Sequence, residues 1–361
     1  DHESAVWLSA GCTGIEGFTI TDSGANGIAV YLNSSKCQAA EILDVPENKT
    51  CAYGRVNIVN NNIYGNDGNG IRVISAVVLI LDNIIHGNVD DGIDGCFYCG
   101  VECVDPEAIT HSPACSEIIY NEIYGNGPSG KGVWEVGNPP QFTRSGTNCT
   151  VHDGWTDSGI QIRCVGMLQD PRQDGADDVL YIVHNNIHDN YHAGIYLWED
   201  ATIGGNLTIQ ANKLIDNGIF GLSTRAAIPD RVDFRYNDII GNTYWGVKNW
   251  DDDNFTAKEN YWGEPGGPSE GPAPIVQCIE CRCHEEDQQS DALGNGDAVS
   301  HRVHYNPWLY VSAADVFHDT PSPVRMYGSD SLLLQTGWNT LSVPCKLAEV
   351  ADSVGEIEML G

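Results

Sequence analysis

Asparagine and apolar residues recur at fixed positions along this chain. The pattern Asn-x4-Asn-x3-Gly-apolar occurs five times, and an apolar side chain lies two residues after each leading Asn. The five copies begin at Asn61, Asn83, Asn185, Asn212 and Asn237. A sixth copy keeps Asn121 and Asn126 but reaches its apolar residue late, at Val133. Such short, regularly spaced units predict a stacked repeat rather than a single globular core.

The repeats predict strands and turns. Each unit is too short and too polar to bury its own apolar side, so it has to stack on a neighbour. Strand alternation places the leading Asn and the apolar residue two later on the same, inward side. We expect each Asn to hydrogen-bond the Asn of the next coil and to accept left-handed backbone geometry, and the Gly to supply a positive φ. The predicted fold is all-β: a right-handed parallel β-helix, or solenoid, with Cys-rich loop insertions and a C-terminal β segment.

Interruptions of the pattern divide the chain into segments. We expect the β-helix to span residues 1–268, with insertions at about 96–116 and 135–178. The later segments are an acidic Cys-rich insertion at 269–298, a closing coil and linker at 299–330, and the start of an incomplete C-terminal β-domain at 331–361. Residues 15–30 already have the character of a coil and no signal peptide precedes Asp1, so we expect a processed or truncated precursor.

The composition agrees with the pattern and limits the kinds of partner that the protein can bind. The chain has 40 Gly and only 3 Met, as a turn-rich all-β repeat requires. Acidic residues outnumber basic ones by 50 to 18, which gives a formal net charge of −32. This charge argues against nucleic acid as a partner, because the phosphates would be repelled. No apolar run is long enough to span a bilayer, so we expect no direct membrane insertion.

Cysteines and glycosylation sequons predict an extracellular or cell-surface location. The Asn-x-Ser/Thr sequons are at Asn33, Asn48, Asn148, Asn206 and Asn254. Of the 13 cysteines, those we assign to disulfides lie in the insertions and are Cys96, Cys99, Cys103, Cys115, Cys278, Cys281 and Cys283. The spacing of Cys96, Cys99 and Cys103 also resembles a zinc thiolate site, which is the alternative that we weigh against disulfides.

The end of the repeat series resembles a known family. Asn260-Tyr261-Trp262-Gly263 interrupts the pattern, Tyr305-Asn306-Pro307-Trp308-Leu309 follows, and Gly337-Trp338-Asn339 comes later. Together with the coils, these motifs resemble the periplasmic NosD-like family and β-helix proteins of archaeal and bacterial cell surfaces. The resemblance implies the architecture of a parallel β-helix. Such proteins include lyases, hydrolases, epimerases, adhesins and scaffolds, so it does not select one function.

One acidic motif invites comparison with polygalacturonases. Asp90-Asp91-Gly92-Ile93-Asp94 resembles part of the β-helix members of that family, but their Gly-His-Gly and Arg-x-Lys elements are absent. Asp90, Asp91 and Asp94 carry the hard oxygen ligands that Ca²⁺ prefers, and Ca²⁺ is the one cofactor that the sequence suggests. We favour a structural turn here, and we interpret Arg72 on a neighbouring coil as a solvated side chain.

A second set of residues comes from aligning the three late copies. Trp198, Arg225 and Trp250 lie thirteen residues after their leading Asn and therefore share one column. Glu199 follows the first and Asp251 the last. Aromatic rings edged by carboxylates are suited to bind a sugar chain, so all five are carbohydrate-binding candidates. The alternative is that the tryptophans pack under neighbouring loops.

The sequence leaves three classes of function open. We favour a secreted or cell-surface structural protein, glycosylated and disulfide-bonded, that assembles with copies of itself into a filament, sheath or surface layer. The first alternative is an extracellular polysaccharide lyase or glycoside hydrolase, although no catalytic residue is assigned. The second is a carbohydrate-binding adhesin that uses the column of Trp198 and Trp250. In the last two cases the partner is an extracellular polysaccharide.

Overall fold

The computed structural model describes eleven segments of the chain. These are residues 4–8, 13–31, 55–97, 99–101, 113–127, 157–165, 179–203, 205–225, 231–251, 253–270 and 292–313. They form strands and turns with almost no helix, which confirms the prediction of an all-β protein. In this part of the chain no helix is long and apolar enough to cross a lipid bilayer. Asp1–Tyr310 form one compact unit, which contains every strand described below.

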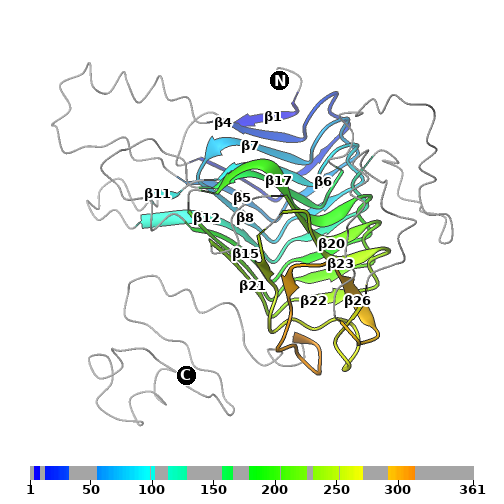
Figure 1. Ribbon diagram of the computed structural model, residues 1–361. Helices are drawn as coiled ribbons and strands as arrows, with labels where there is room; N and C mark the ends of the chain where they lie inside the picture. Colours follow the sequence, from blue (N-terminus) through cyan, green and yellow to red (C-terminus); the bar gives the residue numbers. More distant parts are fainter. Residues whose placement is uncertain are drawn as a thin grey trace, which may run out of the picture. The chain divides into compact units, whose positions relative to one another are not determined.

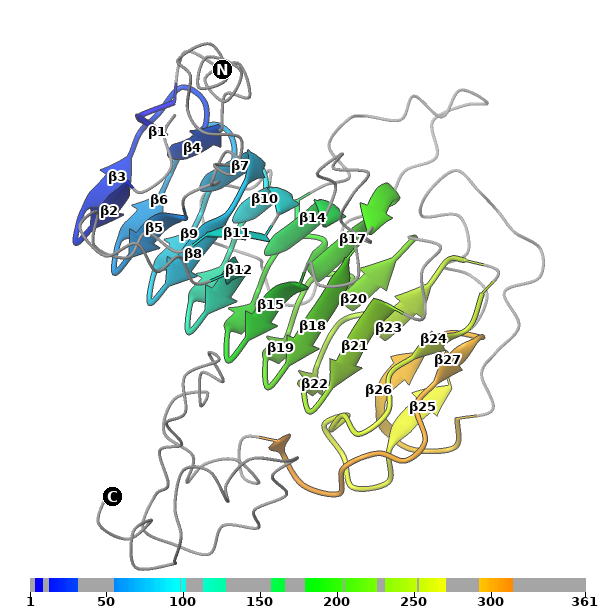
Figure 2. The same ribbon diagram turned by 90° about the vertical axis from the view of Figure 1, so that its left-hand side faces the viewer.

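Most strands belong to three long parallel sheets (Figures 1 and 2). The ten-stranded sheet runs in the order β1 (Val6–Leu8), β4 (Ile28–Tyr31), β7 (Ile71–Ala76), β10 (Ile93–Phe97), β14 (Ile160–Val165), β17 (Ala193–Ile203), β20 (Phe220–Thr224), β23 (Trp245–Asn249), β26 (Gly296–Val299) and β25 (Pro268–Glu270). The seven-stranded sheet contains β3 (Thr19–Thr21), β6 (Asn62–Tyr64), β9 (Ile84–His86), β13 (Glu122–Tyr124), β16 (Asn186–His188), β19 (Lys213–Ile215) and β22 (Asp238–Ile240).

The third sheet has one antiparallel member. Its parallel strands are β2 (Gly14–Glu16), β5 (Val56–Val59), β8 (Val78–Leu81), β12 (Pro113–Ile119), β15 (Val179–Val183), β18 (Asn206–Gln210) and β21 (Val232–Arg235). β11 (Cys99–Val101) pairs with β12 in the antiparallel sense. A separate parallel pair is formed by β24 (Phe255–Thr256) and β27 (Val303–His304).

The strand register follows the sequence repeat. Each sheet takes one strand from successive repeats, so that equivalent residues lie side by side. The apolar residue of the pattern forms one such column, which runs through Ile63, Ile85, Ile123, Ile187, Leu214 and Ile239. All six side chains are fully buried in the core. This arrangement confirms the predicted inward direction and is compatible with a parallel β-helix.

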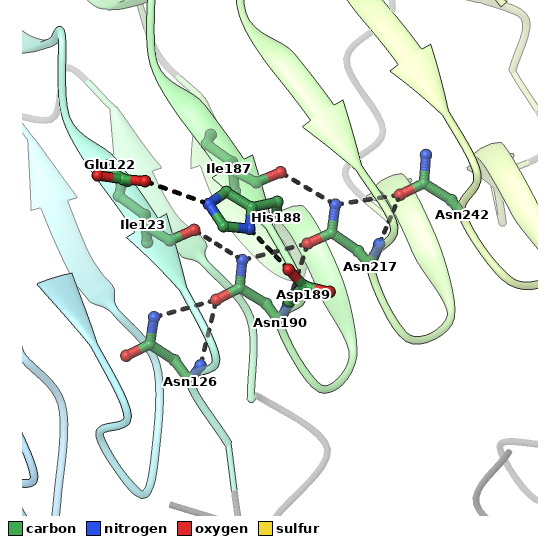
Figure 3. A network of polar contacts seen from close by, with 9 residues as sticks. All are labelled: Glu122, Ile123, Asn126, Ile187, His188, Asp189, Asn190, Asn217 and Asn242. Atoms are coloured by element: carbon green, nitrogen blue, oxygen red, sulfur yellow. Dashed lines mark hydrogen bonds and ion pairs between the residues drawn. The ribbon is translucent and has the colours of Figure 1, made fainter. Parts of the chain in front are cut away.

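Two ladders of asparagine side chains connect the repeats. Each Nδ2 donates to the Oδ1 of the equivalent Asn one repeat later, at 2.8–3.1 Å. Figure 3 shows part of the second ladder, from Asn126 through Asn190 and Asn217 to Asn242. In every one of these bonds between asparagines the donor belongs to the earlier repeat, and the second ladder ends where Asn242 donates to Asp297 at 2.7 Å. The predicted hydrogen bonding between asparagines is thus confirmed.

The predicted backbone geometry of the turns is wrong at two positions. Left-handed φ angles belong to the residues immediately before the ladder asparagines, for example Tyr120 (56°) and Asp189 (54°), and not to the asparagines themselves. The Gly of the pattern has no positive φ either. At Gly194 an added Cβ would lie 2.8 Å from the Gly221 carbonyl oxygen and 2.9 Å from Asn217 Nδ2. Glycine is therefore required there because the next repeat approaches closely.

One disulfide joins two strands of the ten-stranded sheet. Cys96 of β10 is bonded to Cys164 of β14, its register partner. The bond confirms the disulfide predicted for Cys96, but its partner Cys164 lies in a strand and is not among the cysteines predicted to pair. Because the Cys96 sulfur is oxidised, the alternative of a zinc site through this thiolate is wrong.

A second cysteine that was predicted to form a disulfide is also bonded. Cys115 is disulfide-bonded and lies opposite Cys99 in the antiparallel pair of β11 and β12. Cys103, Cys278, Cys281 and Cys283 lie outside the described residues.

Candidate functional site

A second set of side chains projects from the outer side of the ten-stranded sheet. They follow directly after the inward-facing core residues of successive strands, which fixes their outward direction. In register order they are Arg72, Asp94, Gln161, Tyr196, Ser223 and Lys248. With the side chains around them they form what we call the outer face. Its polar half belongs to β7, β10, β14 and the turns that lead into them, and its aromatic half to β17, β20 and β23.

Asp94 is the centre of the polar half. Arg72 Nη1 lies 2.9 Å from its Oδ2, and Arg163 Nε lies 2.6 Å from its Oδ1. Gln161 Nε2 donates to the same Oδ1 at 3.1 Å. Asp94 is almost completely buried, so two guanidinium groups compensate its charge. Arg72 is therefore an ion-pair partner, and its interpretation as a solvated side chain is wrong.

Two further carboxyl groups lie in the turns before β10 and β14. Asp91 Oδ1 accepts a hydrogen bond from the Ser158 backbone N–H at 2.7 Å, and burial, followed by the charge of Asp94, raises its pKa well above the usual range. Burial and then the charge of Asp90 raise the pKa of Asp157 to about 8. Asp157 is 2% exposed, and its Oδ2 has no hydrogen-bond partner. Asp157 is therefore mainly protonated at neutral pH.

His192 precedes β17 and is buried beside the aromatic half. Its ring meets the rings of Tyr196 and Phe220 edge to face, at centroid distances of 5.5 and 5.3 Å. Neither ring nitrogen has a hydrogen-bond partner. Burial, followed by the charge of Arg225, lowers the pKa of His192 to about 3, so the imidazole is neutral and offers one donor and one acceptor.

Cations and indoles alternate in the aromatic half. The Arg163 guanidinium lies 5.3 Å from the centroid of the Trp198 ring. Lys248 Nζ lies between two other indoles, 4.9 Å from Trp245 and 4.4 Å from Trp250. Because Arg163 also contacts Asp94, it joins the two halves of the outer face.

The predicted column of Trp198, Arg225 and Trp250 exists in the structure. The preceding residues are register partners, and the Arg225 N–H and the Trp250 N–H donate to the previous repeat at 3.1 and 2.9 Å. Arg225 lies over the Trp250 ring at 5.3 Å, and both indoles are partly buried, with Trp198 edge to face with Tyr196 and Trp250 with Phe220. Asp251 turns back into its own loop, where Oδ1 accepts from the Asp253 N–H at 3.1 Å. The backbone of Glu199 lies in β17, and its side chain is outside the described part.

The acidic motif gains no support as a calcium site. The oxygens of Asp94 are engaged by Arg72 and Arg163, and Asp91 accepts a backbone hydrogen bond. Among the described residues, no group of three or more His, Cys, Asp or Glu side chains could hold a metal ion.

Two of the predicted glycosylation sites are on the surface. Asn206, at the start of β18, and Asn254, just before β24, are both exposed. Asn33, Asn48 and Asn148 lie outside the described residues.

The sequence predicted no role for Asp157, Gln161 and Arg163 in the polar half, or for Lys248 in the aromatic half. A signal existed, because Gln161 and Lys248 both lie two residues after the repeated Gly, as Asp94 does. Reading that position in every repeat would have placed these side chains in one column.

A regular aromatic stack lies on the seven-stranded sheet. Tyr64, His86, Tyr124 and His188 stack in chain order, with centroid distances of 4.9, 4.8 and 5.0 Å. His188 also contacts Asp189 at 2.7 Å and Glu122 at 3.6 Å (Figure 3). The four rings each lie three residues after the leading Asn of their repeat, so the strand register brings them into one stack.

No protein-family profile, curated protein or solved structure matches this chain.

Proposed function

We propose that this chain is an extracellular, right-handed parallel β-helix whose outer face binds carbohydrate. The winding of three parallel sheets, one strand per repeat, supports the architecture, which is also that of the NosD-like and cell-surface proteins that the sequence resembles. The carbohydrate-binding role is supported by the chemistry of the outer face.

The observation that carries this proposal is a group of buried polar atoms without hydrogen-bond partners. They are Asp157 Oδ2, Ser158 Oγ, Gln161 Oε1 and both ring nitrogens of His192. Leaving such an atom unpaired costs about 1–3 kcal/mol. Buried polar groups of native proteins are nearly always paired, so a group of unpaired ones calls for a partner such as an ordered water or a ligand.

Sugar hydroxyl groups have the chemistry that these atoms lack. A hydroxyl both donates and accepts, so one sugar can satisfy carboxyl, amide and imidazole atoms together. The C–H surface of a sugar packs against aromatic rings, which Trp198 and Trp250 supply on the neighbouring strands. Polar and aromatic groups on one face are typical of carbohydrate sites.

Assembly into a filament, sheath or surface layer remains a separate prediction. Assembly of this kind does not depend on the outer face, and the contacts within the described segments do not test it. For the outer face we propose a polysaccharide as the partner, and not a second copy of the chain.

Replacing both tryptophans tests the binding role. The double variant Trp198→Ala with Trp250→Ala is compared with the wild type by electrophoresis through gels that contain neutral or anionic polysaccharides. We expect at least a ten-fold weaker retardation by the polysaccharide that retards the wild type most. The matched control is Tyr64→Ala with Tyr124→Ala, which removes two aromatic rings from the seven-stranded sheet and should leave retardation unchanged. Equal retardation of wild type and tryptophan variant contradicts the proposal.

A further inference from the structure

We propose that the protein forms a symmetric dimer through the N-terminal end of its three parallel sheets. This end, which we call the open end, consists of the edge strands β1, β2 and β3 and of Phe18 in the turn between the last two. Figure 2 shows the three strands in blue, at the opposite end of the sheets from β25 and β26. The partner is a second copy of the chain, and the proposal does not depend on the outer face or on carbohydrate binding.

Core side chains are incompletely covered at the open end. Ile15 of β2 is only partly buried, whereas its register partners Ile58 and Ile80 are completely buried. Val6 and Leu8 of β1 are also only partly buried, although they pack against the same core. The next repeat covers these side chains from one side, and no described strand lies on the other. The open end therefore leaves apolar surface that a partner can cover.

Phe18 is the most exposed aromatic side chain of the open end. It holds the position of a ladder asparagine, because its N–H donates to Asn61 Oδ1 at 3.0 Å, as the N–H of Asn61 does to Asn83 Oδ1 at 2.9 Å. Asn61 is 2% exposed, whereas Phe18 is 58% exposed. Terminal repeats of stacked proteins usually have a polar outer face, which keeps them soluble. An apolar end instead marks an interaction site.

The edge strands of the open end carry almost none of the features that prevent pairing with another chain. An edge strand leaves half of its N–H and C=O groups without a strand partner, and native proteins protect such edges with proline, lysine or other charges. β1 reads Val-Trp-Leu, β2 Gly-Ile-Glu and β3 Thr-Ile-Thr, so Glu16 is their only charged residue. These strands can therefore form hydrogen bonds to the edge strands of a partner.

The C-terminal end of the sheets is closed, so it does not complement the open end. Trp262 packs into the core there and is fully buried. The edge strand β25 begins with Pro268, which has no N–H, and ends with the exposed Glu270. Leu293 and Tyr310 are exposed in this part of the chain, but neither belongs to a strand.

A symmetric arrangement follows from this difference between the two ends. The apolar edge surface of one open end finds its complement in the open end of a second copy. A two-fold axis then brings the two open ends together, and their edge strands meet in the antiparallel sense, which parallel sheets commonly accept at an edge. Such an interface closes after two chains, so it gives a dimer and not a filament.

A charge placed at each end tests the proposal. Sedimentation velocity of the wild type should show a reversible equilibrium between one and two copies. Added salt should increase the dimer fraction, because it screens the repulsion between two chains of net charge −32. Phe18→Asp should raise the dissociation constant at least ten-fold. It should keep the β-sheet circular dichroism of the wild type, because Phe18 is mainly exposed.

Tyr310→Asp is the matched control, since it places the same charge on an exposed aromatic position outside the open end. It should leave the dissociation constant unchanged. Hydrogen exchange locates the contact in the wild type itself. The amides of β2 and β3 should exchange more slowly at concentrations where the dimer prevails, whereas those of β25 should exchange at an unchanged rate.

Three results would overturn the proposal. A wild type that sediments as one copy at every concentration and salt overturns the dimer. An unchanged dissociation constant in Phe18→Asp overturns the assignment to the open end. Masses that grow beyond two copies with rising concentration overturn the two-fold arrangement and favour end-to-end assembly.

Discussion

Glycine serves two different purposes at two positions of the repeats. Gly194 has an ordinary φ but lies against the backbone of the next repeat, whereas Gly125 has φ = 62° and open space around its Cα. The position of Gly125 is held by Asp189 and Asp216 in later repeats, at φ angles of 54° and 50°. A side chain therefore fits at the position of Gly125 but not at that of Gly194.

This difference predicts opposite responses to substitution. Gly194→Ala should destabilise the fold by about 1–3 kcal/mol, because its Cβ would meet the Gly221 carbonyl oxygen and the ladder amide of Asn217. Gly125→Asn should change stability by less than about 1 kcal/mol, since Asn tolerates left-handed geometry. Chemical denaturation of both variants measures the difference. Equal losses at the two positions would show that close approach is not the reason for Gly194.

Protonation of Asp157 makes stability depend on pH. Its pKa is raised from 3.8 to about 8 in the folded protein, so the folded state holds the proton more tightly than the unfolded chain. The stability that this group contributes is therefore complete below pH 4 and is lost as the pH rises towards 8. Asp157→Asn, which cannot ionise, should gain melting temperature over the wild type between pH 5 and pH 8, with a difference that widens as the pH rises. A constant difference across that range would contradict the assigned protonation.

Among neighbouring strands of the ten-stranded sheet, β10 and β14 are the farthest apart in sequence. The Cys96–Cys164 disulfide closes a loop with a sequence separation of 68 residues. Because it limits the freedom of the unfolded chain, its removal should lower stability by about 2–4 kcal/mol.

Cys96→Ser with Cys164→Ser tests this contribution. We expect a lower melting temperature and retained β-sheet circular dichroism, because parallel hydrogen bonds still join β10 to β7 and β14 to β17. The control is Cys164→Ser alone, which should lose as much as the pair. Peptide mapping without reduction identifies the bond directly, and a Cys96 peptide joined to any other cysteine would refute the pairing.

Strand register was the part of these elements that could be predicted. The apolar column from Ile63 to Ile239 and the aromatic stack of Tyr64 and His86 follow from counting residues after each leading Asn. Backbone geometry could not be counted in this way. The hydrogen bonds that the amides make to the next repeat decide whether an Asn or the residue before it takes the left-handed φ. Tyr120 and His184 take it, although neither residue type favours this conformation.

Across the whole molecule, the aromatic half of the outer face could be predicted from the sequence better than the polar half. Trp198 and Trp250 could be aligned because their repeats are regular. Asp157 and Gln161 flank the start of β14, which belongs to the repeat of Asn121 and Asn126 but follows Asn126 only after a long insertion. The count that found the aromatic half therefore does not reach them. The hydrogen bond from Gln161 to Asp94 joins residues far apart in sequence, which only the register of β10 and β14 brings together.

The first asparagine ladder keeps its geometry whatever length of chain lies between its members. Its amides join residues that are 22, 38, 64, 27, 25 and 23 positions apart, and every one of these hydrogen bonds measures 3.0 or 3.1 Å. A segment can thus be grafted between two asparagines without disturbing the strands on either side, whereas a repeat can be gained or lost only as a whole unit. Diversification of such a protein is therefore confined to its loops and to the number of its repeats, and the frame that carries them is inherited unchanged.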